Sequence, residues 1–194
     1  MLVPKILILS GSTRGKSYNS RLAGSAYRIF SSFECEVNRI SLDDYPLPIY
    51  NGDLETQKGP PEQAVKLARL FDLHDGIMLV SPEYNGSVTP LMKNTLDWVS
   101  RVKGDNRGKI IPYEGKVFAL ASASPGKLGG IRGLSHLRDI MISIGATVIA
   151  KQVAVSSAAS AFDEMDNLTN EGVRDLLKGV CDSLVKTARL LSMK

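Results

Sequence analysis

The sequence predicts an α/β fold in which five parallel strands form an open sheet with helices on both faces, a three-layer αβα arrangement. One observation is that short apolar runs alternate with longer segments whose apolar residues recur at helical spacing. A second is that several runs, such as Ile77–Ser81, are almost wholly apolar, as expected of parallel strands that are covered on both faces. Strands that alternate with helices along one chain are typical of this architecture.

The strands are expected where the apolar or alternating runs stand, and each run is short enough for one strand. They are Ile6–Leu9, Glu34–Ser41, Ile77–Ser81, Lys116–Ala123 and Thr147–Ala150. Residues 42–61 are rich in Asp, Pro, Gly and Asn, so we expect a long connection there.

The helices are expected where apolar residues repeat every three or four positions. They are Tyr18–Phe30, a helix starting at Pro61, Pro90–Arg101, Ile131–Ile144 and Glu171–Ser192. Pro61 and Pro90 suit a helix start, because the first turn needs no N–H from its first residue.

The length and composition are those of an ordinary globular protein. The chain has 194 residues, 43% hydrophobic and 23% charged, which predicts a single domain over residues 1–194. Its longest apolar runs are far too short to span a membrane, and its N-terminus does not resemble a signal peptide. Cys35 and Cys181 form no C-x-x-C pair. We therefore expect a cytoplasmic protein without membrane partner, disulfide framework or metal site.

The net charge of +4 is mildly basic, and its one local excess lies between Arg101 and Lys109. A solvated loop is the first interpretation of this segment. A surface that attracts phosphorylated substrates is a second. A nucleic-acid surface is disfavoured, because no aromatic residues alternate with the basic ones, so no nucleic-acid partner is expected.

The segment Lys5–Leu22 has the layout of a phosphate site: a strand, a tight polar loop and a helix start. The free N–H groups of a helix's first turn and the positive end of its dipole attract anions. The segment also supplies hydroxyl, amide and cationic groups, from Ser12, Thr13, Ser17, Ser20, Asn19, Arg14 and Lys16. An ordinary turn with a serine cap is the alternative interpretation.

Two better-known glycine motifs do not match this loop. A P-loop has four residues between its glycines, whereas only three separate Gly11 from Gly15. The dinucleotide motif G-x-G-x-x-G is absent, because Thr13 and Lys16 stand at two of its glycine positions. A site for one terminal phosphate, as on a mononucleotide, remains.

Two further polar loops follow the third and fourth expected strands, and ligands of such sheets bind where these loops meet. In Pro82–Ser87, the pair Asn85-Gly86 favours a turn that could present backbone N–H groups beside Tyr84, which would suit a flat heteroaromatic ring. A plain loop with Tyr84 packed on a neighbour fits equally well. In the third loop, Gly126, Gly129 and Gly130 would let the backbone approach a ligand.

Two stretches together resemble the NADPH-dependent FMN reductase family, which is flavodoxin-like and includes quinone and chromate reductases. They read G-S-T-R-G-K-S-Y-N-S and S-P-E-Y-N-G-S-V-T-P-L-M-K-N-T-L-D-W. The resemblance implies FMN whose phosphate is held by Ser12, Arg14, Ser17, Asn19 and Ser20, with Thr13 and Tyr18 in the same loop. It places the flavin ring against Pro82, Glu83, Tyr84 and Asn85, and its pyrimidine side near Ser122, Ala123, Ser124 and Gly126.

The same resemblance implies the reaction. Hydride would pass from NADPH to FMN, and electrons would then pass to a quinone, free flavin, azo compound or chromate. The cofactor supplies this chemistry, so no catalytic side chain is assigned. The family also implies a homodimer or homotetramer. We expect His136 to be structural, Lys93, Asn94, Asp97 and Trp98 to fix the helix behind the second loop, and Arg101 to serve a subunit contact.

Two other functions remain open at this point. A flavodoxin-type electron carrier would bind FMN without reacting with a nicotinamide, but such carriers are typically acidic and this chain is basic. A phosphotransfer enzyme could use Lys16-Ser17, but the glycine spacing and the lack of an Asp that ends an apolar strand count against it.

Overall fold

The computed structural model describes residues 3–192, and its centre is a sheet of five parallel strands in the order β2-β1-β3-β8-β9. The strands are β1 (Lys5–Ser10), β2 (Glu36–Ile40), β3 (Gly76–Val80), β8 (Val117–Ala123) and β9 (Thr147–Val155). The chain adds β2 on one side of β1, and the later strands of this sheet, β3, β8 and β9, on the other. The carboxyl ends of β1 and β3 therefore flank the switch point where ligands of such sheets bind.

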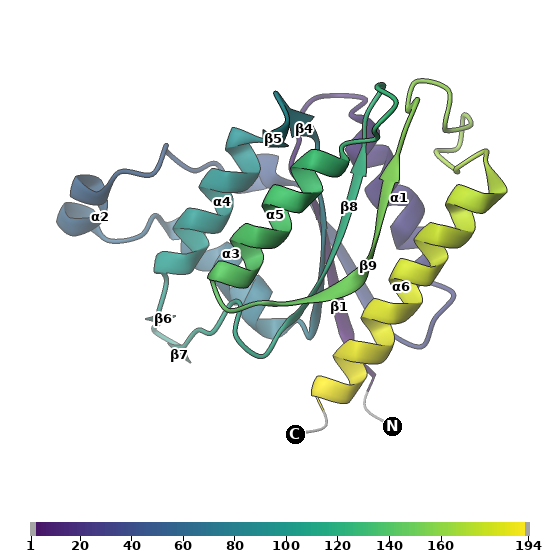
Figure 1. The fold of residues 1–194 in the computed structure, drawn as a ribbon. Helices are drawn as coiled ribbons and strands as arrows, with labels where there is room; N and C mark the ends of the chain where they lie inside the picture. The colour runs from purple at the N-terminus through teal and green to yellow at the C-terminus, as the bar shows by residue number, and fades with distance from the viewer. Residues whose placement is uncertain (1–2, 193–194) are drawn as a thin grey trace.

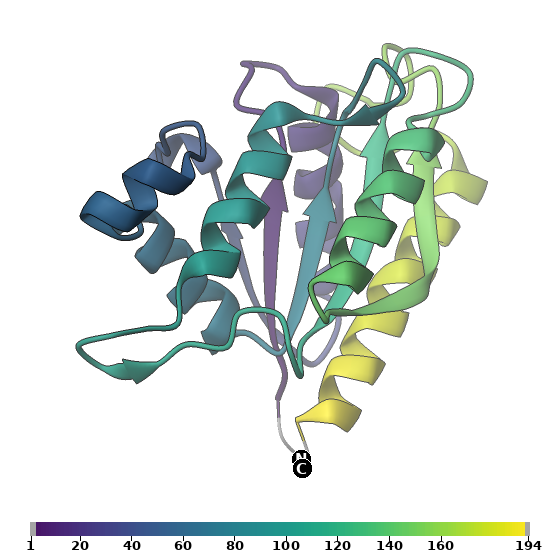
Figure 2. The same ribbon diagram turned by 60° about the vertical axis from the view of Figure 1, so that its left-hand side comes forward.

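Helices cover both faces of the sheet, which confirms the three-layer prediction (Figures 1 and 2). One face carries α1 (Tyr18–Phe30) and α6 (Glu171–Leu191). The other carries α3 (Glu62–Leu73), α4 (Pro90–Arg101) and α5 (Ile131–Ser143). The loops that leave β1, β3 and β8 all lie at the top edge of the sheet in Figure 2.

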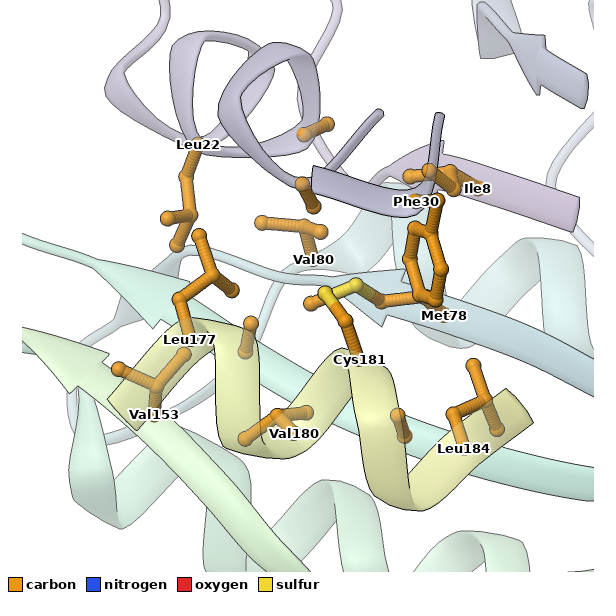
Figure 3. Close-up of a cluster of buried hydrophobic side chains, with 14 of the residues drawn as sticks. Ile8, Leu22, Phe30, Met78, Val80, Val153, Leu177, Val180, Cys181 and Leu184 are labelled. Atoms are coloured by element: carbon orange, nitrogen blue, oxygen red, sulfur yellow. The ribbon is translucent and has the colours of Figure 1, made fainter. Parts of the chain in front are cut away.

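Each face of the sheet has its own apolar core. One core lies between the sheet and helices α1 and α6 (Figure 3). It contains Leu22 and Phe30 of α1 and Met78 of β3. Helix α6 contributes Leu177, Cys181 and Leu184. On the other face, Phe71, Trp98 and Phe118 are fully buried. Strands β1, β3 and β8 are buried along almost their whole length, as their apolar sequences predict.

The helix boundaries follow from local capping. The Ser17 side chain accepts from the N–H of Ser20 at the start of α1, and the Thr89 side chain accepts from the N–H of Met92 at the start of α4. Pro90 occupies the first position of α4. Both helices span the residues that the sequence predicts.

Residues 42–61 form the predicted long connection, between β2 and α3, but it contains elements that the sequence analysis did not predict. The structure has a 3-10 turn, η1 (Leu42–Asp44), and a short helix, α2 (Gly52–Lys58), that projects from the body of the protein (Figure 1). Asn51 caps α2 by accepting from two N–H groups, and Gly59 ends it with a φ of 71°. None of its residues is buried, so it has no apolar stripe to reveal it.

The fifth strand is longer than predicted, since β9 continues past Ala150 to Val155. Polar Lys151 and Gln152 break the apolar pattern, and the pairing with β8 shifts at this point. The Arg138 guanidinium of α5 donates to Ile149 O at 2.9 Å and to Gln152 Oε1 at 2.8 Å. These bonds give hydrogen-bond donors to two oxygen atoms in the irregular part of the strand.

The basic segment 101–109 contains a small hairpin, β6 (Gly104–Asp105) and β7 (Gly108–Lys109). It is held by Arg69 of α3, whose guanidinium pairs with Asp105 and donates to Gly108 O at 3.1 Å and Lys109 O at 3.2 Å. Lys103, Arg107 and Lys109 remain exposed, as a solvated loop requires.

Across residues 3–192, no helix combines the length and apolarity needed to cross a bilayer.

Candidate functional site

Three loops enclose one cavity at the carboxyl edge of the sheet, over the switch point. We call them the phosphate loop (residues 11–17, after β1), the hairpin loop (residues 82–88, after β3) and the third loop (residues 124–130, after β8). The central cavity has a volume of about 320 Å³. It is lined by Ser12, Arg14, Ser17, Tyr18, Asn19, Pro82, Glu83, Tyr84, Ala123, Ser124 and Pro125.

The cavity brings together most of the residues that the sequence analysis expects to bind a cofactor. The others lie apart from its lining. Thr13, Asn85 and Gly126 are exposed in the same three loops, Ser20 lines a neighbouring cavity, and Ser122 is fully buried. Pro125 also lines the cavity; it was not named as a binding residue, although it lies within the range 122–126 that the resemblance places near the ring.

The phosphate loop leaves hydrogen-bond donors free. Within residues 3–192, nothing accepts from the backbone N–H groups of Tyr18 and Asn19, the first two residues of α1. Ser17 is 2% exposed and serves as the N-cap. The Arg14 guanidinium lies 5.7 Å from the centre of the Tyr18 ring, so the ring supports the cation at the cavity wall. This donor set suits an anion.

The Asn19 side chain connects the end of the phosphate loop to the start of the third loop. Its Nδ2 donates to Ala123 O at 2.8 Å, and its Oδ1 accepts from Ala123 N at 2.9 Å. Both bonds are buried, and they fix the start of α1 to the end of β8. The sequence analysis expected this amide to be a ligand donor, whereas the structure uses it to position the cavity walls.

The hairpin loop is built as predicted around Asn85-Gly86. Its two short strands are β4 (Glu83–Tyr84) and β5 (Ser87–Val88), and the turn residues have φ values of 52° and 79°. Positive φ at both central positions defines a type I′ turn, which Asn-Gly favours. At its end, the Thr89 hydroxyl donates to Gly11 O at 2.9 Å, which ties the hairpin loop to the phosphate loop.

Gly11 allows the phosphate loop to lie against α4. A side chain there would come within 3.0 Å of Met92 Cε. The N–H of Gly11 also donates to Val80 O at 2.9 Å. The phosphate loop therefore leaves the sheet in contact with both α4 and β3.

The Glu83 carboxylate is directed at helix α5. Its Oε2 accepts from the N–H of Gly133 at 2.9 Å, and its Oε1 lies 3.4 Å from Arg132 Nε. Its side chain is only 11% exposed. Since Gly130, the N-cap of α5, has no capping side chain, Glu83 supplies the missing acceptor.

Gly129 and Gly130 of the third loop approach other parts of the protein rather than the cavity, which corrects the role expected of them. A side chain at Gly129 would meet Ala154 of β9 at 2.7 Å, and one at Gly130 would meet Ser122 Oγ at 2.0 Å. Their φ values of 62° and 93° also require glycine. Ser122 Oγ is buried and has no hydrogen-bond partner in the described part of the chain. Its side chain thus lies beneath the start of α5.

Asn94 and Trp98, which were expected to fix the helix behind the hairpin loop, connect α4 to the segment before α2. Asn94 binds Tyr50 N and Pro48 O at 2.8 and 2.9 Å, and the Trp98 indole also donates to Pro48 O. Arg101 contacts Glu55 of α2 in the same chain at 2.8 Å, and this guanidinium holds the pKa of Glu55 below its usual value.

The structure also shows the surroundings of Lys93 and His136. Lys93 pairs with Asp97 one turn further along α4. His136 was expected to be structural, and its Nδ1 lies 3.0 Å from Ser87 Oγ, between α5 and the hairpin loop.

The relatives of this chain include an FMN reductase and a quinone reductase. It is 31% identical over 189 residues to an NAD(P)H-dependent FMN reductase of Pseudomonas aeruginosa, with 96% of each chain covered. It is 34% identical over 148 residues to a quinone reductase of Escherichia coli, which covers 76% of this chain and 74% of that protein.

A solved structure shares the fold. It is that of FerB, a flavoenzyme NAD(P)H:(acceptor) oxidoreductase from Paracoccus denitrificans, with a TM-score of 0.79 and 23% identity over 96% of this chain and 98% of that one. Residues 4–160 match the sequence pattern of one protein family, which is described as NADPH-dependent FMN reductase. With the flavodoxin-like sheet order and the three loops at its edge, this match establishes that the chain belongs to the NADPH-dependent FMN reductase family.

Proposed function

We propose that this protein is an NAD(P)H-dependent FMN reductase that binds FMN in the central cavity and passes electrons to a small acceptor. The observation that carries the proposal is the composition of that cavity. One end offers free backbone N–H groups, serine hydroxyls and Arg14, and the other offers Pro82, Tyr84 and Ala123. An anion and a flat apolar ring joined by a short linker would match these two ends.

The donor set suits the phosphate of FMN. The phosphate would lie at the start of α1, against the N–H groups of Tyr18 and Asn19 and the Ser12 hydroxyl. Arg14 would add a charge-assisted hydrogen bond. The ring would lie against the hairpin loop, where the exposed Tyr84 stands beside the cavity.

Bound FMN supplies the capacity to take a hydride from a nicotinamide and to release electrons to an acceptor. The chain's own residues bind and orient. Asn19 and Thr89 keep the three loops at fixed spacing, and Glu83 holds the hairpin loop against α5. Because the reaction needs no protein nucleophile, no catalytic side chain is proposed.

The acceptor is proposed by chemical class: a quinone, free flavin, azo compound or chromate. Tyr84 is 51% exposed at the cavity, which supports an aromatic contact for a planar acceptor. NADPH is the proposed donor, in keeping with the family's description and the basic phosphate loop.

We also propose a homodimer or homotetramer, in which the projecting α2 takes part (Figure 1). Ile49, just before α2, is 77% exposed, and α2 buries none of its own residues, which supports a contact in this region. Light scattering on the native protein and on Ile49→Asp tests the proposal, and an unchanged mass would remove α2 from the interface. A cytoplasmic location is supported by the two free thiols, Cys35 and Cys181.

The site is tested by FMN titration of the flavin-free protein and of Arg14→Ala. Loss of one charge-assisted bond to phosphate should weaken FMN binding roughly tenfold or more. Arg107→Ala is the matched control, since Arg107 is exposed in the β6–β7 hairpin. Equal FMN affinity in the native and Arg14→Ala proteins would remove Arg14 from the phosphate site.

A further inference from the structure

A second cavity opens at the same edge of the sheet, on the β2 side of the phosphate loop. We call it the edge cavity; its volume is also about 320 Å³. It is lined by Ser10, Ser12, Ser20, Ala23, Arg39, Ile40, Ser41 and Asp44. No aromatic residue lines it, and its walls are mainly hydroxyls, one guanidinium and one carboxylate. Its chemistry therefore differs from that of the central cavity.

The two cavities meet at the phosphate loop, because Ser12 lines both. Ser20 is the link on the α1 side, and its Oγ lies 3.5 Å from both Ser10 Oγ and Ser12 O. These are weak contacts, so the Ser20 hydroxyl can turn to a ligand with little loss. A phosphate held at the start of α1 would thus have the central cavity on one side and the edge cavity on the other.

Arg39 supplies the positive charge of the edge cavity. It is exposed at the end of β2 and forms no ion pair with any residue in 3–192. Its guanidinium lies over Gly24, where a Cβ would come within 2.8 Å of Nη1. A glycine inside a helix is destabilising relative to alanine, and here its lack of a side chain leaves room for the guanidinium. Arg39 is therefore placed beside α1 and available to an anion.

Asp44, at the end of η1, supplies an acceptor in the same cavity and has no ion pair in the described residues. A carboxylate in a cavity that adjoins a phosphate site is suited to the hydroxyls of a ribose, as in dinucleotide sites. It would repel a phosphate carried on that ribose. The edge cavity thus matches an unmodified ribose rather than a 2′-phosphorylated one.

We propose that the edge cavity binds the adenosine monophosphate half of FAD, so that the protein accepts FAD as well as FMN. FAD is FMN extended from its phosphate by this half, and the extension leaves from the point where the two cavities meet. Arg39 and Ser20 bind the added phosphate, and Asp44 accepts from the ribose hydroxyls. The inference rests on the proposed FMN site in the central cavity.

The test is equilibrium dialysis of the flavin-free protein against FMN and against FAD. Chromatography of the bound flavin separates FAD from FMN released by hydrolysis. The native protein should bind FAD within about tenfold of its affinity for FMN. Arg39→Ala should weaken FAD binding roughly tenfold through loss of one charge-assisted bond, and leave FMN binding within about twofold.

Two variants complete the experiment. Asp44→Asn should weaken FAD about threefold and leave FMN unchanged, since the neutral amide is a poorer acceptor for ribose hydroxyls. Arg174→Ala is the matched control, an exposed arginine of α6 outside both cavities and without an ion pair in residues 3–192. It should leave both flavins unchanged. Retained FMN binding shows that each variant is folded.

The outcomes separate this inference from the proposed function. FMN binding without FAD binding overturns the inference and leaves the proposed function standing. FAD binding that Arg39→Ala does not change also overturns it. Failure of both flavins to bind overturns the central site and the inference together.

Discussion

The carboxylate of Glu83 accepts a hydrogen bond from the backbone N–H of Gly133 at 2.9 Å, so the hairpin loop caps helix α5. The two residues lie on elements that flank the central cavity. A glycine N-cap without a side-chain acceptor leaves α5 dependent on this bond from outside the helix. The position of the cavity wall formed by the hairpin loop is therefore coupled to the start of α5.

Glu83→Ala should lower the free energy of unfolding by about 1 kcal/mol, the usual effect of a lost N-cap acceptor. It should also weaken FMN binding, because the hairpin loop loses its anchor. Glu83→Gln keeps an acceptor oxygen, so it should lose less stability and less FMN affinity than Glu83→Ala. Urea unfolding and FMN titration measure the two effects, with the exposed Glu114→Ala as control. Equal behaviour of Glu83→Ala and Glu114→Ala would contradict the capping role.

Asn19→Asp tests the bridge between α1 and β8. The aspartate keeps an acceptor for the Ala123 N–H, but it places a carboxylate against the Ala123 carbonyl in a buried position. We expect a loss of about 1–3 kcal/mol in the free energy of unfolding. Chemical unfolding measures it, and Asn106→Asp in the exposed β6–β7 turn is the control. The bridge would be unimportant if both variants were as stable as the native protein.

Gly86→Ala should destabilise the hairpin loop by about 1–2 kcal/mol, because its φ of 79° suits glycine and strains other residues. The added methyl group meets no atom within 4 Å, so only backbone strain acts. Gly52→Ala is the control, since Gly52 also has open space but no positive φ. Thermal unfolding of both variants measures the difference, and equal melting temperatures would argue against strain at residue 86.

Stability should fall as the pH drops below about 6.5, because His74 is buried in its neutral form. The ring accepts from Asn38 at 3.0 Å and contacts Leu70 O through Nδ1, and burial lowers its pKa from the usual 6.5. The unfolded chain then binds a proton that the folded chain does not. The loss is at most about 1.4 kcal/mol per pH unit from this group.

The measurement is urea unfolding between pH 5.5 and 7.5. His74→Gln removes the titrating group and should give a flatter dependence on pH over this range. Equal slopes for the native protein and for His74→Gln would assign the acid sensitivity to other groups.

The sequence predicts the parts of this molecule that depend on local chemistry. Tyr18–Phe30 and Pro90–Arg101 were located to the residue, because an N-cap serine or threonine, a helical apolar stripe and Pro90 all agree. The Asn85-Gly86 turn was likewise predicted, since few residue pairs adopt positive φ at both positions. Helix α2 was missed because it buries nothing, although Asn51 and Gly59 mark its two ends.

Side-chain direction within the site could not be predicted from the sequence. Asn19, Glu83 and Ser122 stand in the right loops, but their side chains are directed at Ala123, Gly133 and the start of α5. Each of these partners is distant in the chain, and the contacts arise only when the strands are assembled. Sequence position therefore identified the loops, whereas tertiary packing decides which atoms face the cavity.

The most direct measurement is an anaerobic visible spectrum of the protein supplied with FMN, recorded before and after addition of NADPH. The account predicts protein-bound flavin absorption that bleaches when NADPH is added and returns when a quinone follows. Bound flavin that neither NADPH nor NADH bleaches would contradict the reductase function and indicate an electron carrier.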